Sequence, residues 1–280
     1  MTIEEIEQLC RKYEIYPKRS MGQNFLLCDE ALDSAVLAGD IKSGDVILEA
    51  GPGFGFLTKK LSARAGKVIG IELDKKLYGI VKERLQNFKN VEIIMEDVLK
   101  LSEIQIQEKL GKKYKIVSNL PYNITGHFLK KFLSVKHKPD LMVLMLQEEV
   151  AERICALPGK MSILSVSAQY YSKPCIILKA PKEWFFPVPE VDSAIIRFDI
   201  KKDVIDEEKQ KNFFQIVRIG FSARRKMLKN NLYNGFKGMG KSIDMKDIEN
   251  ILRKCDLNIN ARAQDLSVEE WIRLAEKIKN

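Results

Sequence analysis

The sequence predicts a doubly wound α/β sheet followed by a small helical domain, and two patterns carry this prediction. From about residue 45 to residue 147, short apolar runs alternate with amphipathic stretches, which is typical of a parallel sheet covered by helices. A charged run at residues 201–211 then separates this region from a segment with helical spacing and few strand signals. We therefore expect a first domain over residues 1–200 and a helical second domain over residues 201–280.

The expected strands and helices follow one another at short intervals in the first domain. Five apolar runs have the composition of buried parallel strands, and the stretches between them have the spacing of amphipathic helices. The expected strands are 46–48, 68–71, 91–94, 116–117, 141–146 and a late one at 194–198; the expected helices are 56–65, 75–88, 125–135, 162–170 and 268–278. Ligands of such sheets bind at the carboxyl ends of the strands, so the residues that follow the strands are the candidate site residues.

The composition is that of a soluble globular protein, with 45% hydrophobic and 30% charged residues. The five cysteines are scattered without a C-x-x-C pair, and neither of the two histidines lies at ligand spacing from them, so we expect no metal site. The first nine residues contain three Glu and no apolar stretch, and the strongest apolar run, 141–146, is too short to cross a bilayer. We therefore expect a cytoplasmic protein without membrane attachment.

A glycine-rich turn joins the first expected strand to the first expected helix. Between Leu48 and Phe56 the glycines stand at alternate positions, and glycine lets the backbone turn sharply or approach a ligand closely. Phe56 occupies the place where a dinucleotide fingerprint requires its third glycine, so the pattern argues against NAD. A nucleoside cofactor without a pyrophosphate fits better, with Gly51 and Gly53 as its contacts; a purely structural turn is the alternative.

Two acidic residues follow the second and third expected strands. Glu72 ends the second strand, where a carboxylate can accept hydrogen bonds from both hydroxyls of a ribose. Asp97 follows the third strand, where a carboxylate can accept a hydrogen bond from the amino group of an adenine. Together with the glycine turn, these two residues predict S-adenosylmethionine as the cofactor.

The run Ser118-Asn119-Leu120-Pro121-Tyr122-Asn123 follows the fourth expected strand. The exocyclic amine of adenine is a poor nucleophile, because its lone pair is delocalised into the ring. The side-chain oxygen of Asn119 and the carbonyl of Leu120 can localise that lone pair by accepting hydrogen bonds from the two N–H groups of the amine. Pro121 restricts Leu120 to extended conformations, and Tyr122 offers an aromatic face to a base that has left its stack. These four residues are the candidate catalytic residues, acting by orientation; a plain strand-to-turn junction is the alternative.

Seven motifs resemble, in order, those of the ribosomal RNA adenine dimethyltransferases, a family that also contains the erythromycin-resistance methylases. Two of them are the runs 51–53 and 119–122 already described, and the series extends from about residue 20 to residue 271. The other five are Gln23–Leu26, Ile71–Asp74, Gln147–Val150, Phe186–Ser193 and Gly220–Lys226. The resemblance implies a Rossmann-like class I S-adenosylmethionine-dependent methyltransferase sheet with a small all-helical C-terminal domain.

The resemblance also implies a reaction and a partner. The family's housekeeping branch transfers methyl groups to N6 of two adjacent adenines in the 3′-terminal hairpin of small-subunit (16S) ribosomal RNA. Leu120 within its motif and the run 220–232 favour this branch. Two alternatives stay open: a large-subunit methyltransferase that confers antibiotic resistance, and a ribosome assembly factor without turnover. The expected partner is the small ribosomal subunit, with no membrane and no metal, and the expected state is a monomer.

Further site residues come from the resemblance alone. It implies that Asn24 and Leu26 contact S-adenosylmethionine together with the glycine turn, the two acidic residues and Asn119. It also implies that the ring of Phe185 stacks on the flipped adenine. Two segments depart from the family pattern: Thr125–His127 lacks the usual proline, and Lys160–Ser162 lacks a Tyr-Gly pair.

The net charge of +9, from 47 Lys and Arg against 38 Asp and Glu, favours a polyanionic partner. Basic residues gather near the start, at Arg11, Lys12, Lys18 and Arg19, and again between residues 218 and 229. On one continuous helix, Arg218, Arg225 and Lys229 would form a stripe suited to following phosphates. Given an RNA substrate, we expect RNA contacts rather than a merely solvated face at Arg218, Arg224, Arg225, Lys226 and Lys229.

Overall fold

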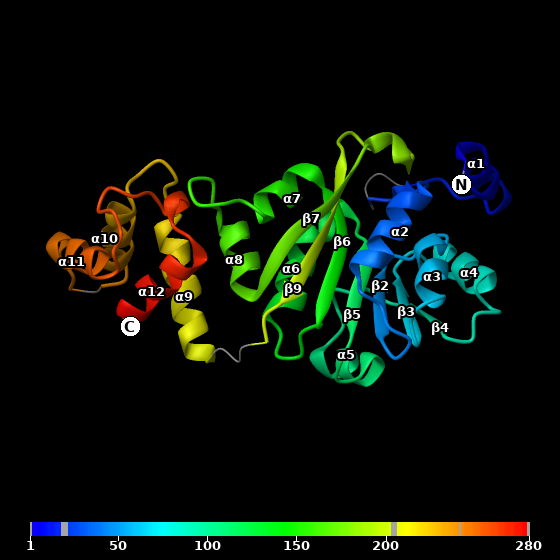
Figure 1. Cartoon of the computed structure of the whole chain (residues 1–280), viewed down its shortest axis with the longest axis horizontal. Helices are drawn as coiled ribbons and strands as arrows, with labels where there is room; N and C mark the ends of the chain where they lie inside the picture. Colours follow the sequence, from blue (N-terminus) through cyan, green and yellow to red (C-terminus); the bar gives the residue numbers. More distant parts are fainter. Residues whose placement is uncertain (1, 18–21, 203–205, 241, 279–280) are drawn as a thin grey trace. The chain divides into compact units, whose positions relative to one another are not determined.

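The structure is a computed structural model that describes residues 2–17, 22–202, 206–240 and 242–278 (Figure 1). The chain forms two compact units, one made of residues 1–151 and 172–200 and the other of residues 152–171 and 201–280. Segment 152–171 thus groups with the C-terminal helices, whereas the sequence analysis places it in the first domain. The reason is packing within the second unit, where the ring of Tyr170 stacks on Phe213 with centroids 4.1 Å apart.

The first unit is built on a seven-stranded sheet with the strand order β4-β3-β2-β5-β6-β9-β7 (Figure 1). The strands are β2 (Val46–Ala50), β3 (Lys67–Glu72), β4 (Val91–Met95), β5 (Lys115–Asn119), β6 (Leu141–Gln147), β7 (Ser172–Ala180) and β9 (Ser193–Ile200). The strands from β4 to β6 are parallel, whereas β9 runs antiparallel to both β6 and β7. The carboxyl ends of all five parallel strands therefore meet at one edge of the sheet.

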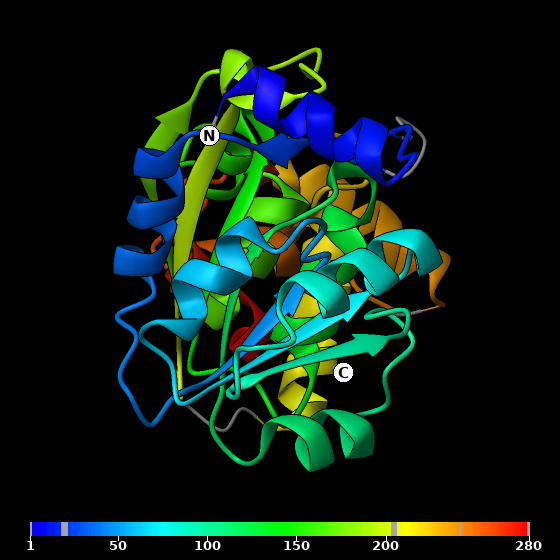
Figure 2. The same cartoon turned by 90° about the vertical axis from the view of Figure 1, so that its right-hand side faces the viewer.

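Helices lie on both sides of this sheet (Figure 2). On one side, α2 (Asp29–Ala38) and α3 (Phe56–Ser62) bury their apolar residues in a cluster that includes Ile47 and Val117 from the strands. Because side chains alternate along a strand, the neighbouring buried residue Leu48 faces the opposite side. The other helices that begin in this unit are α1 (Ile3–Lys12), α4 (Lys75–Arg84), α5 (Glu103–Leu110), α6 (Thr125–Ser134) and α7 (Glu148–Ile154).

A two-stranded sheet joins the N-terminal segment to the segment that leads into β9. Strand β1 (Phe25–Leu26) pairs antiparallel with β8 (Phe185–Phe186), so that Leu26 lies opposite Phe185. The backbone N–H of Leu27 donates to the carbonyl of Trp184 at 2.8 Å and extends the pairing. Asn24 directly precedes β1, so the pairing places it near the segment that connects β8 to β9.

The second unit contains no β-strand among its described residues, which confirms the expected all-helical C-terminal region. Its helices are α8 (Ile163–Tyr171), α9 (Glu207–Gly220), α10 (Leu228–Gly238), α11 (Met245–Lys254) and α12 (Val268–Lys277). The fully buried ring of Trp271 lies directly against Gly220, where a Cβ would collide with it. The absence of a side chain at Gly220 therefore lets α9 and α12 pack closely.

The expected helical stripe of basic residues is wrong. Helix α9 ends at Gly220 and α10 begins at Leu228, so Arg225 lies in the turn between them. The buried side chain of Asn231 donates to the carbonyls of Gly220 (2.6 Å) and Ala223 (3.0 Å). The first bond satisfies a backbone acceptor that the end of α9 leaves open, and the second holds the turn beyond it, so that the two together stabilise the turn in place of a continuous helix.

No helix among the described residues combines the length and the apolar character that crossing a membrane requires.

Candidate active site

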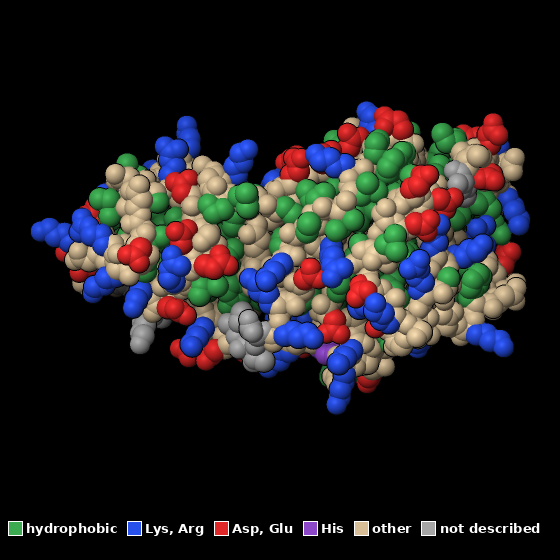
Figure 3. Space-filling view, in the orientation of Figure 1, with side chains coloured by type: hydrophobic (Ala, Val, Ile, Leu, Met, Phe, Trp, Pro, Cys, Tyr) green, Lys and Arg blue, Asp and Glu red, His purple; other side chains and the backbone are tan. Residues whose placement is uncertain are grey.

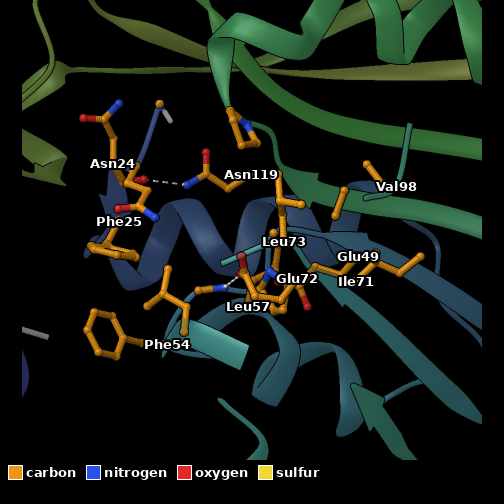
Figure 4. Close-up of a pocket in the computed structure, with 18 of the residues that line it drawn as sticks. Asn24, Phe25, Glu49, Phe54, Leu57, Ile71, Glu72, Leu73, Val98 and Asn119 are labelled. Carbon is orange, nitrogen blue, oxygen red and sulfur yellow. Dashed lines mark hydrogen bonds between the residues drawn. The ribbon is translucent and has the colours of Figure 1, made fainter. Parts of the chain in front are cut away.

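A cavity opens at the edge of the sheet where the parallel strands end (Figure 4). Its empty volume, which includes space open to solvent, is about 1120 Å³. All seven residues expected to contact the cofactor line this cavity: Asn24, Leu26, Gly51, Gly53, Glu72, Asp97 and Asn119. Segments separated by up to 95 residues thus form one site, as between Asn24 and Asn119.

The glycine turn after β2 forms one wall of the cavity. Gly51 and Gly53 have φ angles of +70° and +58°, in the left-handed region that favours glycine. A Cβ on Gly51 would meet only the ring of Pro121, at 3.8 Å, so the missing side chain leaves room inside the cavity. A Cβ on Gly53 would lie 3.0 Å from the ring of Phe25. The turn therefore brings backbone rather than side chains up to a ligand.

Glu72 at the end of β3 is buried and connects the turn to the cavity (Figure 4). Its Oε2 accepts a hydrogen bond from the Gly53 N–H at 3.1 Å, and its Oε1 accepts one from the Asp74 N–H at 2.9 Å. Burial raises the pKa of the carboxyl group, while these backbone donors act in the opposite direction. Since a carboxylate oxygen has two lone pairs, both oxygens can still accept hydrogen bonds from ribose hydroxyls.

The far end of the cavity combines one acidic and two apolar residues. The Oδ1 of Asp97 accepts a hydrogen bond from the Leu99 N–H at 2.9 Å, which fixes the orientation of the carboxylate. Leu73 directly follows Glu72, Val98 directly follows Asp97, and both apolar residues line the cavity (Figure 4). A flat base that donates to Asp97 and rests against aliphatic side chains fits this end. Neither apolar residue was predicted from the sequence, although each directly follows a predicted site residue.

Glu49 is a third cavity-lining residue that was not predicted from the sequence. It lines the cavity from β2 and is only 2% exposed, and its Oε2 has no hydrogen-bond partner among the described residues. Burial, with a smaller contribution from the nearby Glu72 carboxylate, raises the pKa of Glu49 to about 8. The cavity therefore contains a carboxyl group that is largely protonated at neutral pH and has one oxygen open.

We expect Glu49 to make the stability of the protein depend on pH. Its ordinary pKa is 4.5, and the folded value is about 8, so its contribution is fully present below pH 4.5 and is lost as the pH rises to 8. The free energy of unfolding should fall by up to about 1.4 kcal/mol per pH unit within this window. Glu49→Gln cannot ionise, so its urea midpoints should decline less from pH 5 to pH 8. Parallel profiles for the two proteins would contradict the assignment.

The amide of Asn119 is oriented by the N-terminal segment. Its Nδ2 donates to the carbonyl of Asn24 at 3.0 Å, so its Oδ1 points away from that carbonyl (Figure 4). Within the described part of the chain, neither this Oδ1 nor the carbonyl of Leu120 accepts a hydrogen bond. Neither acceptor predicted for the target amine is therefore engaged. Asn119 lines the cavity, whereas Leu120 is 1% exposed and is not among the residues that line it.

The motif around Asn119 is tied to the glycine turn and to the neighbouring strand. The buried hydroxyl of Ser118 donates to the carbonyl of Ala50 at 2.6 Å, which joins the ends of β5 and β2. The N–H of Leu120 donates to the carbonyl of Met145 at 3.4 Å. Pro121, which also lines the cavity, then starts the short 3-10 helix η2 (Tyr122–Ile124), where Tyr122 is half-buried.

Phe185 does not present an open ring. It is 1% exposed and lies in the apolar cluster that also contains Leu26, whereas the neighbouring Phe186 is partly exposed. A base can stack on Phe185 only after the side chains that cover it have moved, so this role stays a prediction. His127 is exposed on α6, and Lys18 and Arg19 lie outside the described residues.

The fold and the cavity define a class I S-adenosylmethionine-dependent methyltransferase. The sheet order with its antiparallel pair at one edge, the glycine turn, and the acidic residues after the next two strands fit this cofactor. No group of three His, Cys, Asp or Glu side chains in the described parts of the chain could hold a metal ion. The model of the family described as ribosomal RNA adenine dimethylase matches residues 16–280, and the chain belongs to this family.

Curated relatives agree with the family. The ribosomal RNA small subunit methyltransferase A of Alkaliphilus oremlandii is 39% identical over 277 residues, which cover 97% of this chain and 95% of the relative. The protein of the same name from Dehalococcoides mccartyi strain 195 is 37% identical and covers 95% of this chain and 90% of its own length.

Solved structures agree as well. A dimethyladenosine transferase from Plasmodium falciparum has a TM-score of 0.74 at 26% identity, and the match covers 89% of this chain and 95% of that one. The 23S rRNA methyltransferase ErmE also has a TM-score of 0.74, over 90% of this chain and 98% of its own, but at 23% identity this likeness concerns the fold.

Proposed function

We propose that this chain transfers methyl groups from S-adenosylmethionine to N6 of two adjacent adenines in the 3′-terminal hairpin of small-subunit ribosomal RNA. The observation that carries the proposal is the oriented amide of Asn119, whose open oxygen stands beside the cofactor cavity. The names of the two relatives described above, both ribosomal RNA small subunit methyltransferase A, at 37% and 39% identity, support the substrate. The products would be N6,N6-dimethyladenines, formed by a monomeric cytoplasmic enzyme during ribosome biogenesis.

The chemistry follows from the placement of two acceptors. S-adenosylmethionine, when bound, supplies an electrophilic methyl group. The Oδ1 of Asn119 and the carbonyl of Leu120 accept hydrogen bonds from the two N–H groups of the amine and turn the nitrogen lone pair out of conjugation with the ring. The ring of Tyr122 supports the base. Catalysis therefore rests on orientation and preorganised dipoles, and it requires no strong general base.

The substrate is tested by a transfer assay with labelled S-adenosylmethionine. Small ribosomal subunits that lack the modification should take up label, whereas large subunits and duplex DNA should not. Label confined to large subunits would move the assignment to the resistance methylases. Cofactor binding without label in any substrate would favour an assembly factor without turnover.

The turn between α9 and α10 is proposed to contact RNA phosphates. Arg224, Arg225 and Lys226 are all exposed there, whereas Lys229 is partly buried and bonded to Glu249 at 2.7 Å. Figure 3 shows Lys and Arg side chains spread over the face drawn rather than gathered in one patch. The distribution of basic residues on this face therefore does not identify an RNA-binding surface. The proposal rests on the exposed turn and on the family's RNA substrate.

We expect the double variant Arg225→Ala/Lys226→Ala to bind small subunits more weakly and with a smaller dependence on salt. Each lost phosphate contact should lower the slope of log affinity against log salt by about 0.7–0.9. Lys246→Ala/Lys254→Ala, which removes two exposed charges from α11, is the matched control. Filter binding over a salt series measures the affinity and its salt dependence for each double variant. Equal slopes for the two would show that the turn does not contact RNA phosphates.

A further inference from the structure

The hydroxyl of Tyr122 is held by a residue from a distant strand. The Tyr122 phenol and the Ser193 Oγ share a hydrogen bond of 2.6 Å across 71 residues of sequence. Ser193 is 0% exposed and begins β9, where it pairs with Gln147 of β6 and with Ala180 of β7. Its hydroxyl is thus fixed between two neighbouring strands of the sheet, and it offers the tyrosine a rigid partner.

The backbone immediately before Ser193 is fixed as well. The carbonyl of Asp192 accepts a hydrogen bond from the Glu148 N–H, and its Oδ1 accepts one from the Lys182 N–H, both at 2.9 Å. The first bond anchors the start of β9 to the end of β6, and the second closes the segment that contains β8. The start of β9 therefore cannot shift without breaking several bonds.

The motif that receives the target amine is thereby held at both ends. At one end, the Asn119 amide donates to the carbonyl of Asn24, and at the other, the Tyr122 hydroxyl bonds to Ser193. Leu120, whose carbonyl is the second acceptor, lies between these two anchors. The position of the aromatic ring relative to the two acceptors is consequently set by two side-chain bonds from opposite sides.

We infer that Ser193 is a positioning residue for methyl transfer. It acts through the Tyr122 phenol, which holds the aromatic face against which the target adenine rests, at a fixed place relative to the two acceptors. The inference rests on the proposed function, since it assigns Ser193 a part in that reaction. Ser193 does not line the cofactor cavity, so its contribution belongs to the step after cofactor binding.

A double-mutant cycle tests this assignment. Ser193→Ala and Tyr122→Phe each remove one side of the shared hydrogen bond and keep the rest of the site. Each should lower kcat on small subunits about tenfold, because small misplacements of reacting groups carry large rate losses. The dissociation constant of S-adenosylmethionine should stay within twofold of wild type, which also reports that the variants are folded. The double variant should lose the same factor of about ten, because both changes break one bond.

The control is Ser172→Ala, which removes another buried serine hydroxyl, at the opposite end of the β7–β9 ladder. Its kcat should remain close to wild type. A hundredfold loss in the double variant, or an equal loss in Ser172→Ala, would show that Ser193 acts on stability independently of Tyr122 and would overturn the inference. A wild-type protein that binds the cofactor but modifies no small subunit would instead refute the proposed function, and the inference with it.

Discussion

Asn119→Ala is expected to lower kcat for methyl transfer by about 100- to 1000-fold while S-adenosylmethionine still binds. The loss compares with removing one preorganised donor from an oxyanion hole, because in both cases a fixed dipole no longer acts on charge that develops during the reaction. The Oδ1 of Asn119 is the only side-chain acceptor assigned to the target amine. Cofactor affinity should fall less than tenfold, since the glycine turn and Glu72 remain.

Asn119→Asp separates the two tasks of this side chain. It keeps an acceptor oxygen for the amine but loses the Nδ2 donor that the carbonyl of Asn24 orients. Its kcat should lie between those of wild type and Asn119→Ala, as measured by single-turnover transfer with saturating cofactor. If Asn119→Ala retained kcat within threefold of wild type, the amine would have to be activated elsewhere.

Glu72→Ala should raise the dissociation constant of S-adenosylmethionine about 100-fold or more. The carboxylate holds the N–H groups of Gly53 and Asp74, so its removal loosens the glycine turn and also takes away the acceptors for the ribose. Hydrogen bonds to a charged group contribute about 1.5–3 kcal/mol each, which corresponds to roughly 10- to 150-fold in affinity.

The matched control for Glu72 is Glu92→Ala. Glu92 is an exposed carboxylate on the neighbouring strand β4, where it bonds only at the surface to Lys67 at 2.8 Å. Titration calorimetry should find wild-type cofactor affinity in this control. An affinity within threefold of wild type for Glu72→Ala would mean that the cofactor does not use the end of β3.

The parallel strands could be predicted from the sequence because burial on both faces makes them continuous apolar runs. β7 could not, since its inner residues alternate between partly buried and exposed and Pro174 interrupts the run. Both features suit an edge strand, where a missing backbone N–H does no harm.

Helix α2 was not predicted, although Ala31, Leu32 and Ala35 have helical spacing. The order of the strands in the sheet depends on long-range packing between elements, which no local sequence pattern predicts.

The lining of the cavity could be predicted to a large extent because many of its residues follow the ends of parallel strands, which converge at one edge. That these residues bind the cofactor stays a prediction. The place of Glu49 in the cavity was not predicted, because its burial and the unbonded state of its Oε2 depend on the surrounding fold. Ser193 was noted only as the end of the run 186–193, and its bond to Tyr122 could not be predicted because the two residues are 71 positions apart. The basic stripe was predicted wrongly because the bonds from Asn231 that stabilise the turn at Arg225 leave no signal in the local sequence.

The central claim is that this site dimethylates two neighbouring adenines of small-subunit RNA through Asn119. Mass spectrometry of 3′-terminal RNA fragments, from unmodified small subunits incubated with the protein and S-adenosylmethionine, tests it most directly. We predict two adjacent N6,N6-dimethyladenines with wild type and unmodified adenines with Asn119→Ala. Unmodified fragments with the wild-type protein, or the same product with both proteins, would contradict the account.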